Sequence, residues 1–428
     1  MKLIVKTLLV VAFPMFFSCG TTEGFTTKIH LTNDSDIALM NKPISIARSE
    51  IDLNNETNLF PMLLDEKGDA ISAQFNDSDD DYRWDELFFV IDLASREEKN
   101  ISVKWVAGLP DFPKRTSVRF GKRPSASKPV RPEIQETLAA NELPKSLGYQ
   151  QYQTDGPSWE NDMVGFRHYL DGRNAKDLFG KKVTEMSPEN VGINAEGAVE
   201  DNYHRMEGWG RDVLAVGNSV GIGGYGLAVG DDLMRLGVTV DDSVNNIAKT
   251  TFKIQAEGPV NSVLSYEYND WKPQNRSYDV REHTSIWPGM YGYKNTVSVS
   301  GLMGNEDLVV GLVNINTDKA LVELLNHERY VIVYTHDKQT YDKKWWLGMA
   351  LILPKERYLG YTDAPKTGDL SNTFLARLRI DEKEPISYYA IAGWEVSDAG
   401  FANEDYFVNY LKQLVDQLSA TVNIEIRN

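Results

Sequence analysis

The sequence has very little cysteine, little histidine and few basic residues relative to acidic ones. Cys19 is the only cysteine among 428 residues, so the mature chain is expected to have no disulfide bond. The net charge of -17 argues against nucleic acid as a partner, because phosphate binding needs a basic surface. With 42% apolar and 25% charged residues, the chain has the composition of a globular protein and the length for two or three domains.

The only long apolar stretch lies at the start of the chain, which reads MKLIVKTLLVVAFPMFFSCG. It has two lysines, an apolar run too short for a comfortable membrane span, and a small residue before Cys19. This pattern is typical of a bacterial lipoprotein signal peptide, residues 1–19, with Cys19 as the lipidated residue. The sequence therefore predicts a protein of the bacterial cell envelope, periplasmic or at the outer-membrane surface, that contacts the membrane only through an N-terminal lipid anchor.

Short strand-like runs begin soon after this segment. They are rich in β-branched and aromatic residues, are separated by Asn, Asp and Gly, and cover residues 28–31, 44–46, 70–75, 86–92 and 101–106. We expect a small β-sandwich domain over residues 24–110.

An aspartate-rich stretch separates the third of these runs from the fourth. Its alternating carboxylates could supply oxygen ligands to a calcium ion, and they are Asp77, Asp79, Asp81 and Asp85. Tyr82 and Phe88 stand where an EF-hand loop has glycine and glutamate, so an acidic turn without a metal is the alternative. A structural calcium ion is the one cofactor that the sequence suggests, and none is expected to be required for activity.

Prolines are frequent between residues 109 and 144, which indicates a surface linker over residues 111–150 with one short helix near 132–141. Residues 151–428 then contain further strand-like runs, at 164–170, 213–216, 250–256, 263–268, 295–299, 308–313, 329–336, 346–353, 374–380 and 386–394. Without amphipathic helices between them, these runs favour large antiparallel sheets packed face to face. The one helix expected in this domain begins after Asn403 and has an apolar stripe formed by Phe407, Leu411, Leu414 and Leu418.

The densest group of acid, base and aromatic side chains lies in residues 203–226, which read YHRMEGWGRDVLAVGNSVGIGGYG. Groups of this kind are costly to bury without partners, so such a cluster usually lines a wet cleft. The candidate site residues are Tyr203, His204, Arg205, Trp209 and Arg211. A solvated loop in which Trp209 covers the core is the alternative.

Two glycine patterns in the same stretch suggest other sites. Residues 217–221, GNSVG, match the nucleophile elbow of hydrolases, and the glycines from 221 to 226 match a dinucleotide-binding motif. Both sites need a helix directly after the motif, and a run of glycines makes a poor helix. We therefore expect a glycine-rich hairpin that allows backbone or ligand to come close.

Four of the six histidines stand near arginine, tyrosine or tryptophan, namely His168, His204, His283 and His336. None has zinc-ligand spacing, so a metal would need histidines from separate strands. In a strand over residues 163–169, Arg167 and Tyr169 would share one face and Phe166 and His168 the other. Rings such as Trp287 beside these polar groups are typical of a sugar-binding cleft, and a place in the sandwich core is the alternative.

Two longer segments resemble a known family. One has the pattern E-x6-R-x-Y-x-D-x-R-N-A-x-D-x-F-G-K, formed here by Glu160, Arg167, Tyr169, Asp171, Arg173, Asn174, Ala175, Asp177, Phe179, Gly180 and Lys181. The other is residues 210–224, GRDVLAVGNSVGIGG. Together with the aspartate-rich stretch, they make the chain similar to secreted or lipid-anchored proteins encoded among bacterial polysaccharide-degrading genes, a family that includes an ulvan oligosaccharide dehydratase. The resemblance implies a galactose-mutarotase-like supersandwich in the large domain and a dehydratase acting on a non-reducing-end uronic acid, but it assigns no catalytic residues.

Such a reaction takes the C5 proton next to the sugar carboxylate and expels the C4 hydroxyl as water. The carboxylate needs a cation, for which Arg167, Arg205 and Arg211 are candidates. The base needs a pKa near the working pH, which favours His204, with Tyr203 beside it.

Other predicted roles follow from the same chemistry. His336 is the second catalytic candidate, and His168, Trp209, His283 and Trp287 are candidates for binding an acidic oligosaccharide. The alternatives are a glycan-binding lipoprotein without activity, and a glycoside hydrolase that uses a carboxylate pair such as Glu160 and Glu207.

Overall fold

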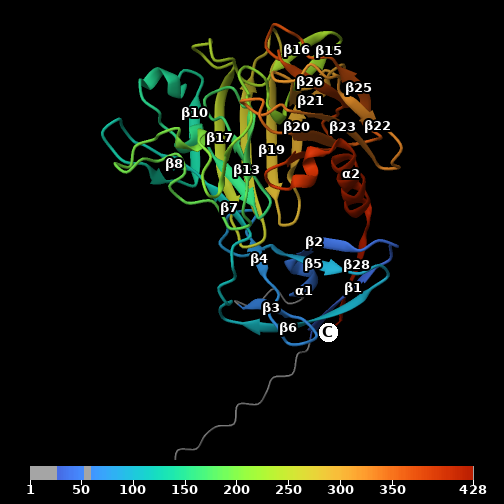
Figure 1. Cartoon of the computed structure of the whole chain (residues 1–428). Helices are drawn as coiled ribbons and strands as arrows, with labels where there is room; N and C mark the ends of the chain where they lie inside the picture. Colours follow the sequence, from blue (N-terminus) through green and yellow to red (C-terminus); the bar gives the residue numbers. More distant parts are fainter. Residues whose placement is uncertain (1–26, 53–58, 428) are drawn as a thin grey trace, which may run out of the picture.

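Two β-sandwiches of unequal size make up residues 27–52 and 59–427, the part of the chain that the computed structural model describes (Figure 1). The predicted signal peptide and Cys19 lie outside the described residues. No helix within the described ranges combines the length and apolar character needed to cross a membrane.

The small sandwich contains strands from both ends of the chain. Its two sheets have the orders β28-β1-β6-β3 and β2-β5-β4. The strands are β1 (Thr27–Asn33), β2 (Leu39–Ala47), β3 (Phe60–Leu64), β4 (Ala73–Asn76), β5 (Glu86–Leu93), β6 (Glu98–Val106) and β28 (Val422–Arg427), with the short helix α1 (Arg48–Ile51) after β2. Alternate residues such as Ile29, Leu31, Ile101 and Val103 are buried between the sheets, as the period of a half-buried strand requires.

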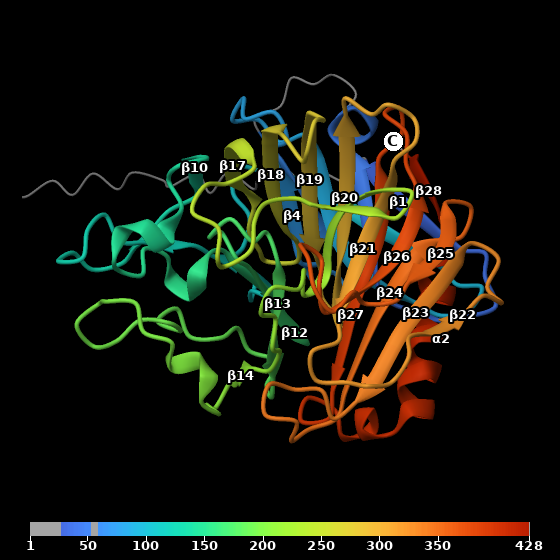
Figure 2. The same ribbon diagram turned by 90° about the horizontal axis from the view of Figure 1, so that it is seen from above.

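The large sandwich is built on a nine-stranded antiparallel sheet with the order β10-β17-β18-β19-β20-β27-β24-β23-β22. Its strands are β10 (Gln135–Ala139), β17 (Ile247–Ala256), β18 (Ser262–Trp271), β19 (Tyr278–Ile286), β20 (Gly292–Ser300), β22 (Val322–Leu324), β23 (Tyr330–Asp337), β24 (Leu347–Pro354) and β27 (Ile386–Trp394). Figure 2 shows the molecule from above, where strands of this sheet such as β18, β19 and β20 lie side by side.

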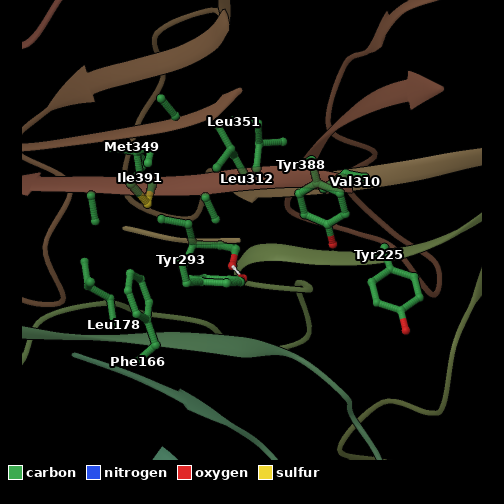
Figure 3. Packing of buried hydrophobic residues seen from close by; sticks show 14 of the residues in the cluster. Phe166, Leu178, Tyr225, Tyr293, Val310, Leu312, Met349, Leu351, Tyr388 and Ile391 are labelled. Atoms are coloured by element: carbon green, nitrogen blue, oxygen red, sulfur yellow. Dashed lines mark hydrogen bonds between the residues drawn. The ribbon is translucent and has the colours of Figure 1, made fainter. Parts of the chain in front are cut away.

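Two five-stranded sheets cover one face of the nine-stranded sheet, in the orders β14-β13-β12-β11-β7 and β16-β15-β21-β26-β25. The first contains β7 (Thr116–Arg119), β11 (Ser158–Asn161), β12 (Val164–His168), β13 (Lys176–Lys181) and β14 (Gly210–Asp212). The second contains β15 (Ile222–Val229), β16 (Asp232–Arg235), β21 (Asp307–Val313), β25 (Tyr358–Thr362) and β26 (Thr373–Arg379). Between the layers, the Phe166 ring packs against the Tyr293 ring, 4.7 Å away (Figure 3). The Tyr388 hydroxyl also donates to Gly223 O across the layers.

The helix α2 (Glu404–Ser419) packs on the other face of the nine-stranded sheet. Asn403 caps it, since its side-chain oxygen accepts from Tyr406 N at 3.1 Å, and Phe407 and Leu411 are fully buried. The remaining elements are β8 (Gly121–Lys122), β9 (Arg131–Pro132) and the 3-10 turns η1 (Pro144–Leu147), η2 (Gln153–Asp155), η3 (Asn202–His204) and η4 (Ala399–Ala402).

The predicted all-β class, with a small sandwich, a large antiparallel one and a C-terminal helix, is confirmed. Several details differ. The helix expected near 132–141 is the edge strand β10, and the expected linker also supplies β7, because both segments complete their hydrogen bonds at sheet edges. Residues 213–216 lie between β14 and β15 and form no strand.

Close packing explains one glycine of the predicted hairpin. The bridge between Lys176 and Gly221 joins the two five-stranded sheets, and a Cβ at Gly221 would lie 1.7 Å from Lys176 O. Gly221 also has φ +73°, which L side chains rarely adopt. The glycines therefore start strand β15 rather than a helix.

Candidate active site beside strands β12 to β14

Strands β12 and β13 carry polar side chains on both of their faces. Arg167 pairs with Asp177 in register and His168 pairs with Lys176, so the first pair points away from the sandwich core and the second into it. Phe166 also faces the core, where it packs on Tyr293. The predicted alternation of these residues is therefore confirmed.

Arg167 is the centre of the outward-facing group, which we call the Arg167 cluster: Arg167, Tyr169, Asp177, Tyr203, His204 and Asp212. The Arg167 guanidinium is 1% exposed, and its Nη2 lies 2.5 Å from Asp177 Oδ2 and 2.8 Å from Asp212 Oδ2. Burial disfavours its charge, but the neighbouring acidic groups hold its pKa well above the usual value. Arg167 therefore binds carboxylates of the protein itself, Asp177 and Asp212, rather than a ligand.

The segment between β13 and β14 covers this face of the sheet. Its residues Val191, Tyr203 and Trp209 pack with Phe179 in a small apolar cluster. The Tyr203 hydroxyl donates to Asp201 Oδ1 at 2.8 Å and to Asp155 Oδ2 at 3.3 Å. Burial, together with these carboxylates, raises the pKa of Tyr203, so its phenol keeps its proton at neutral pH.

His204 is the member of the Arg167 cluster that reaches solvent. Its side chain is 45% exposed, and its Nδ1 lies 3.3 Å from the buried Asp212 Oδ2. Burial and the neighbouring Asp177 raise the pKa of Asp212 well above its usual value, and Arg167 opposes this shift. In its ionised form Asp212 favours a proton on Nδ1, which leaves the lone pair on Nε2. Burial and the Arg167 charge lower the pKa of His204, so the imidazole is neutral at pH 7.

A second loop, residues 338–346, meets His204 and Arg211. The Tyr341 backbone N–H donates to Val213 O at 2.8 Å, and the Tyr341 ring, 61% exposed, lies 6.1 Å from the His204 ring. Arg211 lies 3.4 Å from Asp342 and 5.4 Å from the Trp345 ring, and Lys344 Nζ lies 4.5 Å from the same ring. The Tyr341 ring therefore flanks His204, while Arg211 and Lys344 contact the Trp345 ring of the same loop.

A hollow of about 340 Å³ borders the Arg167 cluster and is lined by residues that include Tyr149, Gln150, Asp155 and Asp171. Asp155 connects the two, since its carboxylate lies 3.5 Å from Arg167 Nη1. Burial raises the pKa of Asp155. The hollow therefore meets the cluster only at Asp155, and His204 is not part of its lining.

The four residues expected to share one concavity are only partly brought together. Arg167 and His204 both lie against Asp212, whereas Arg211, the neighbour of Asp212 on β14, points to the other face of that strand and contacts Asp342 and Trp345. His336 lies on the opposite face of the nine-stranded sheet. The His336 ring is 3% exposed, its Nε2 lies 2.8 Å from Phe401 O, and it packs against Phe407 of α2. It cannot contact a substrate bound at His204.

The remaining predicted binding residues have different surroundings. His168 is fully buried, 3.5 Å from Lys176 Nζ, and burial lowers its pKa to about 3. Arg205 is exposed beside His204, and Trp209 lies beneath the same segment. His283 and Trp287 line a separate hollow between the two sandwiches.

The groups that a glycoside hydrolase or a serine hydrolase would use are not arranged for catalysis. Glu160 is buried and lies 2.6 Å from Lys181 Nζ, whereas Glu207 is exposed. Ser219 of the elbow-like motif is 0% exposed and its hydroxyl donates to Val216 O, with a strand following rather than a helix.

The aspartate-rich stretch forms a turn that brings three of the four predicted ligands together. Oxygens of Asp77, Asp79 and Asp85 lie within 4.8 Å of one another, and Asp81 lies outside this group. Some of these oxygens accept backbone N–H groups, as Asp77 does from Asp80 and Tyr82. Oxygen donors fit calcium, and its binding here stays a prediction.

The sequence patterns indicated only some of the residues around His204. Tyr341 and Lys344 were missed because they lie far along the chain from His204. Their segment, YDKKWW, mixes aromatic and basic residues and could have marked it.

The fold and site define a double β-sandwich protein with a polar cluster beside one five-stranded sheet. The chain belongs to a family described as a domain of unknown function, DUF4861, whose model matches residues 31–424. No curated protein matches it.

Two solved structures are similar to the chain. One is a protein in the glycosyl hydrolase family 38 from Enterococcus faecalis, with 9% identity and a TM-score of 0.47 over 94% of this chain and 48% of that one. The other is an alpha-mannosidase from Enterococcus faecalis V583, with 9% identity and a TM-score of 0.46 over 94% and 46%. The chain thus spans about half the length of these proteins.

Proposed function

We propose that the protein is a dehydratase that removes water across C4 and C5 of the non-reducing-end uronic acid of ulvan-type oligosaccharides. The observation that carries the proposal is the half-exposed His204, whose Nδ1 lies 3.3 Å from the buried Asp212 Oδ2 and whose ring lies beside Tyr341. Lipid attachment at Cys19 would keep this activity at the cell envelope.

His204 is the proposed base. Its neutral Nε2 takes the C5 proton, and no described residue occupies that nitrogen. Asp212 stabilises the imidazolium that forms, because its carboxylate lies beside Nδ1. Arg167 in turn holds Asp212, and Asp177 holds Arg167, so these buried groups position the base rather than touch the sugar.

Arg211 and Lys344 are the proposed partners of the sugar carboxylate. Removing a proton next to a carboxylate develops enolate-like charge, which a cation must stabilise. Both cations border the Trp345 ring, which offers a face for the apolar side of the sugar. Arg167 is not available for this role because two carboxylates already occupy it.

Tyr341 is the proposed acid for the leaving group. As the C5–H bond breaks, its electron pair forms the C4=C5 double bond, and the C4–O bond breaks. The Tyr341 phenol supplies the proton that turns the departing hydroxide into water, and solvent later returns it while the His204 proton is released. The products are one water molecule and an unsaturated uronyl end.

The test is turnover of uronate-ended oligosaccharides, followed by the near-ultraviolet absorbance of the conjugated double bond. His204→Gln should lower kcat about a hundredfold or more, and Tyr341→Phe about tenfold or more, because each removes one proton transfer. Glu200→Gln, an exposed residue of the same covering segment, is the matched control and should keep full activity.

Unchanged turnover in His204→Gln would refute the proposed base. Absence of ultraviolet absorbance with the wild-type chain, together with release of reducing sugar, would instead indicate hydrolysis. Binding of the oligosaccharide with neither product would indicate a glycan-binding protein without activity.

A further inference from the structure

A second hollow, of about 470 Å³, lies between the two sandwiches on the far side of the nine-stranded sheet from the Arg167 cluster. Its floor comes from alternate residues of β19 and β20, since Ser285 pairs with Lys294 and His283 with Thr296. Strands β2 and β5 of the small sandwich form the opposite wall through Lys42, Glu86 and their neighbours. The volume falls in the range of roughly 300–1,000 Å³ that is usual for small-molecule sites.

Positive charge gathers in this hollow although the whole chain carries -17. Burial lowers the pKa of Lys294, and within the described part of the chain no carboxylate pairs with its ammonium. Lys42 donates only to the backbone oxygens of Gln417 and Ala420, and burial and Arg329 lower its pKa to about 8. Such under-compensated ammonium groups favour a bound anion.

The one carboxylate of the lining is itself hydrogen-bonded. Glu86 accepts from Asn76 Nδ2 at 2.7 Å and from the Ser45 hydroxyl. It is therefore oriented by neutral groups of the small sandwich rather than paired with Lys294. The imidazole of His283, exposed on β19, adds a further donor to the same floor.

Apolar faces and hydroxyl groups complete the lining. The Trp287 and Tyr389 rings lie edge to face, 6.3 Å apart. Ser285 donates to Asn261 at 3.1 Å, and Thr296 and Ser387 share a hydrogen bond of 2.8 Å. A smaller hollow of about 150 Å³ shares the Trp287 wall and lies against α2. Aromatic faces with polar rims suit a sugar ring.

We propose that this hollow is a second carbohydrate site, which binds a saccharide unit carrying a negative charge, either a carboxylate or a sulfate, on Lys294. The site is separate from the proposed dehydratase site and needs no turnover there. A chain held at both places would be retained between catalytic events, because two linked sites raise the effective concentration of the ligand.

The experiment is calorimetric titration of the full chain with glucuronate oligosaccharides, neutral glucose oligosaccharides of the same length and their sulfated forms. We expect binding of a charged form and not of the neutral one, and the preferred charged form identifies the group read by Lys294. Lys294→Gln should weaken this binding about tenfold or more, because it removes a charge-assisted hydrogen bond. Lys294→Arg should restore most of it.

Lys249→Gln is the matched control, since Lys249 is exposed on strand β17 of the same sheet. The titrations are repeated in the His204→Gln chain, so that loss of activity and loss of this site are separated. Thermal unfolding checks that the wild-type and Lys294→Gln chains are both folded. Equal affinity of the two folded chains for every charged oligosaccharide would overturn the proposal. Equal binding of neutral and charged oligosaccharides would do so as well.

Discussion

Two ionic clusters lie back to back on strands β12 and β13 and differ in their access to solvent. On the core side, Lys176 and Glu282 lie 2.5 Å apart, both fully buried, with His168 next to them. Tyr225 and Tyr268 donate to the same Glu282 carboxylate. On the outer side, the Arg167 cluster ends at His204, which is 45% exposed.

The comparison shows that similar charges on neighbouring residues have different uses when their surroundings differ. In the closed cluster every ionic group has its partners within the sandwich, so it fixes how the sheets pack. In the open cluster the buried ions lie beside one imidazole, whose Nε2 has no partner among the residues that the structure describes. The predictions below separate these two uses.

The largest expected effect comes from breaking the closed cluster. Lys176→Met should lower the free energy of unfolding by about 3–5 kcal/mol, because the Glu282 carboxylate then lies buried without a cation. Urea unfolding measures this. Adding Glu282→Gln to Lys176→Met should recover part of the loss, and a loss below about 1 kcal/mol would contradict the closed-cluster interpretation.

The next effect concerns the open cluster. Asp212→Asn should lower kcat about a hundredfold, or about 2.7 kcal/mol in the activation barrier, because His204 loses the carboxylate that orients it. Steady-state kinetics on uronate-ended oligosaccharides measure this, with Glu200→Gln as the control. A drop in stability with unchanged kcat in the folded fraction would give Asp212 a purely structural role.

A third effect is the pH dependence of stability. His168 has a pKa of about 3 when folded and about 6.5 when unfolded, so the unfolded chain binds an extra proton between these values. Its contribution to stability is complete above pH 6.5 and falls by at most about 1.4 kcal/mol per pH unit toward pH 3. Unfolding titrations of wild-type and His168→Asn should differ in slope only in this window, and parallel curves would contradict it.

The smallest effect is a shift in the pH profile of the reaction. The rate should rise with pH through the pKa of His204 and then level off, since only the neutral imidazole accepts a proton. Because burial and Arg167 lower that pKa, the midpoint should lie below the usual 6.5. Measurements of kcat/KM against pH test this, and a midpoint above 6.5 would point to another base.

Local patterns in the sequence predicted the parts of the molecule that depend on local chemistry. The alternation at residues 166–169 assigned Arg167 and His168 to opposite faces, and the structure places them so. Asn403 and the apolar stripe behind it predicted α2 for the same reason. Capping and strand periodicity depend on neighbours a few residues away.

Contacts between distant segments were harder to predict. His336 was expected near His204, but α2 covers its face of the sheet, which no local pattern records. Tyr341 comes to His204 only because its loop hydrogen-bonds to Val213. His283 and Trp287 were expected at the same site as His204, yet they line the hollow between the sandwiches, because β19 turns its odd-numbered residues outward.

The pairing of β28 with β1 has a consequence for synthesis of the chain. Lys28 stands opposite Arg427 in this pair, so one sheet of the small sandwich joins segments from opposite ends of the described part of the chain. The ribosome releases β1 long before β28 is made, and one edge of β1 stays unpaired until β28 emerges. The small sandwich is therefore completed only after the residues of the large sandwich have been synthesised.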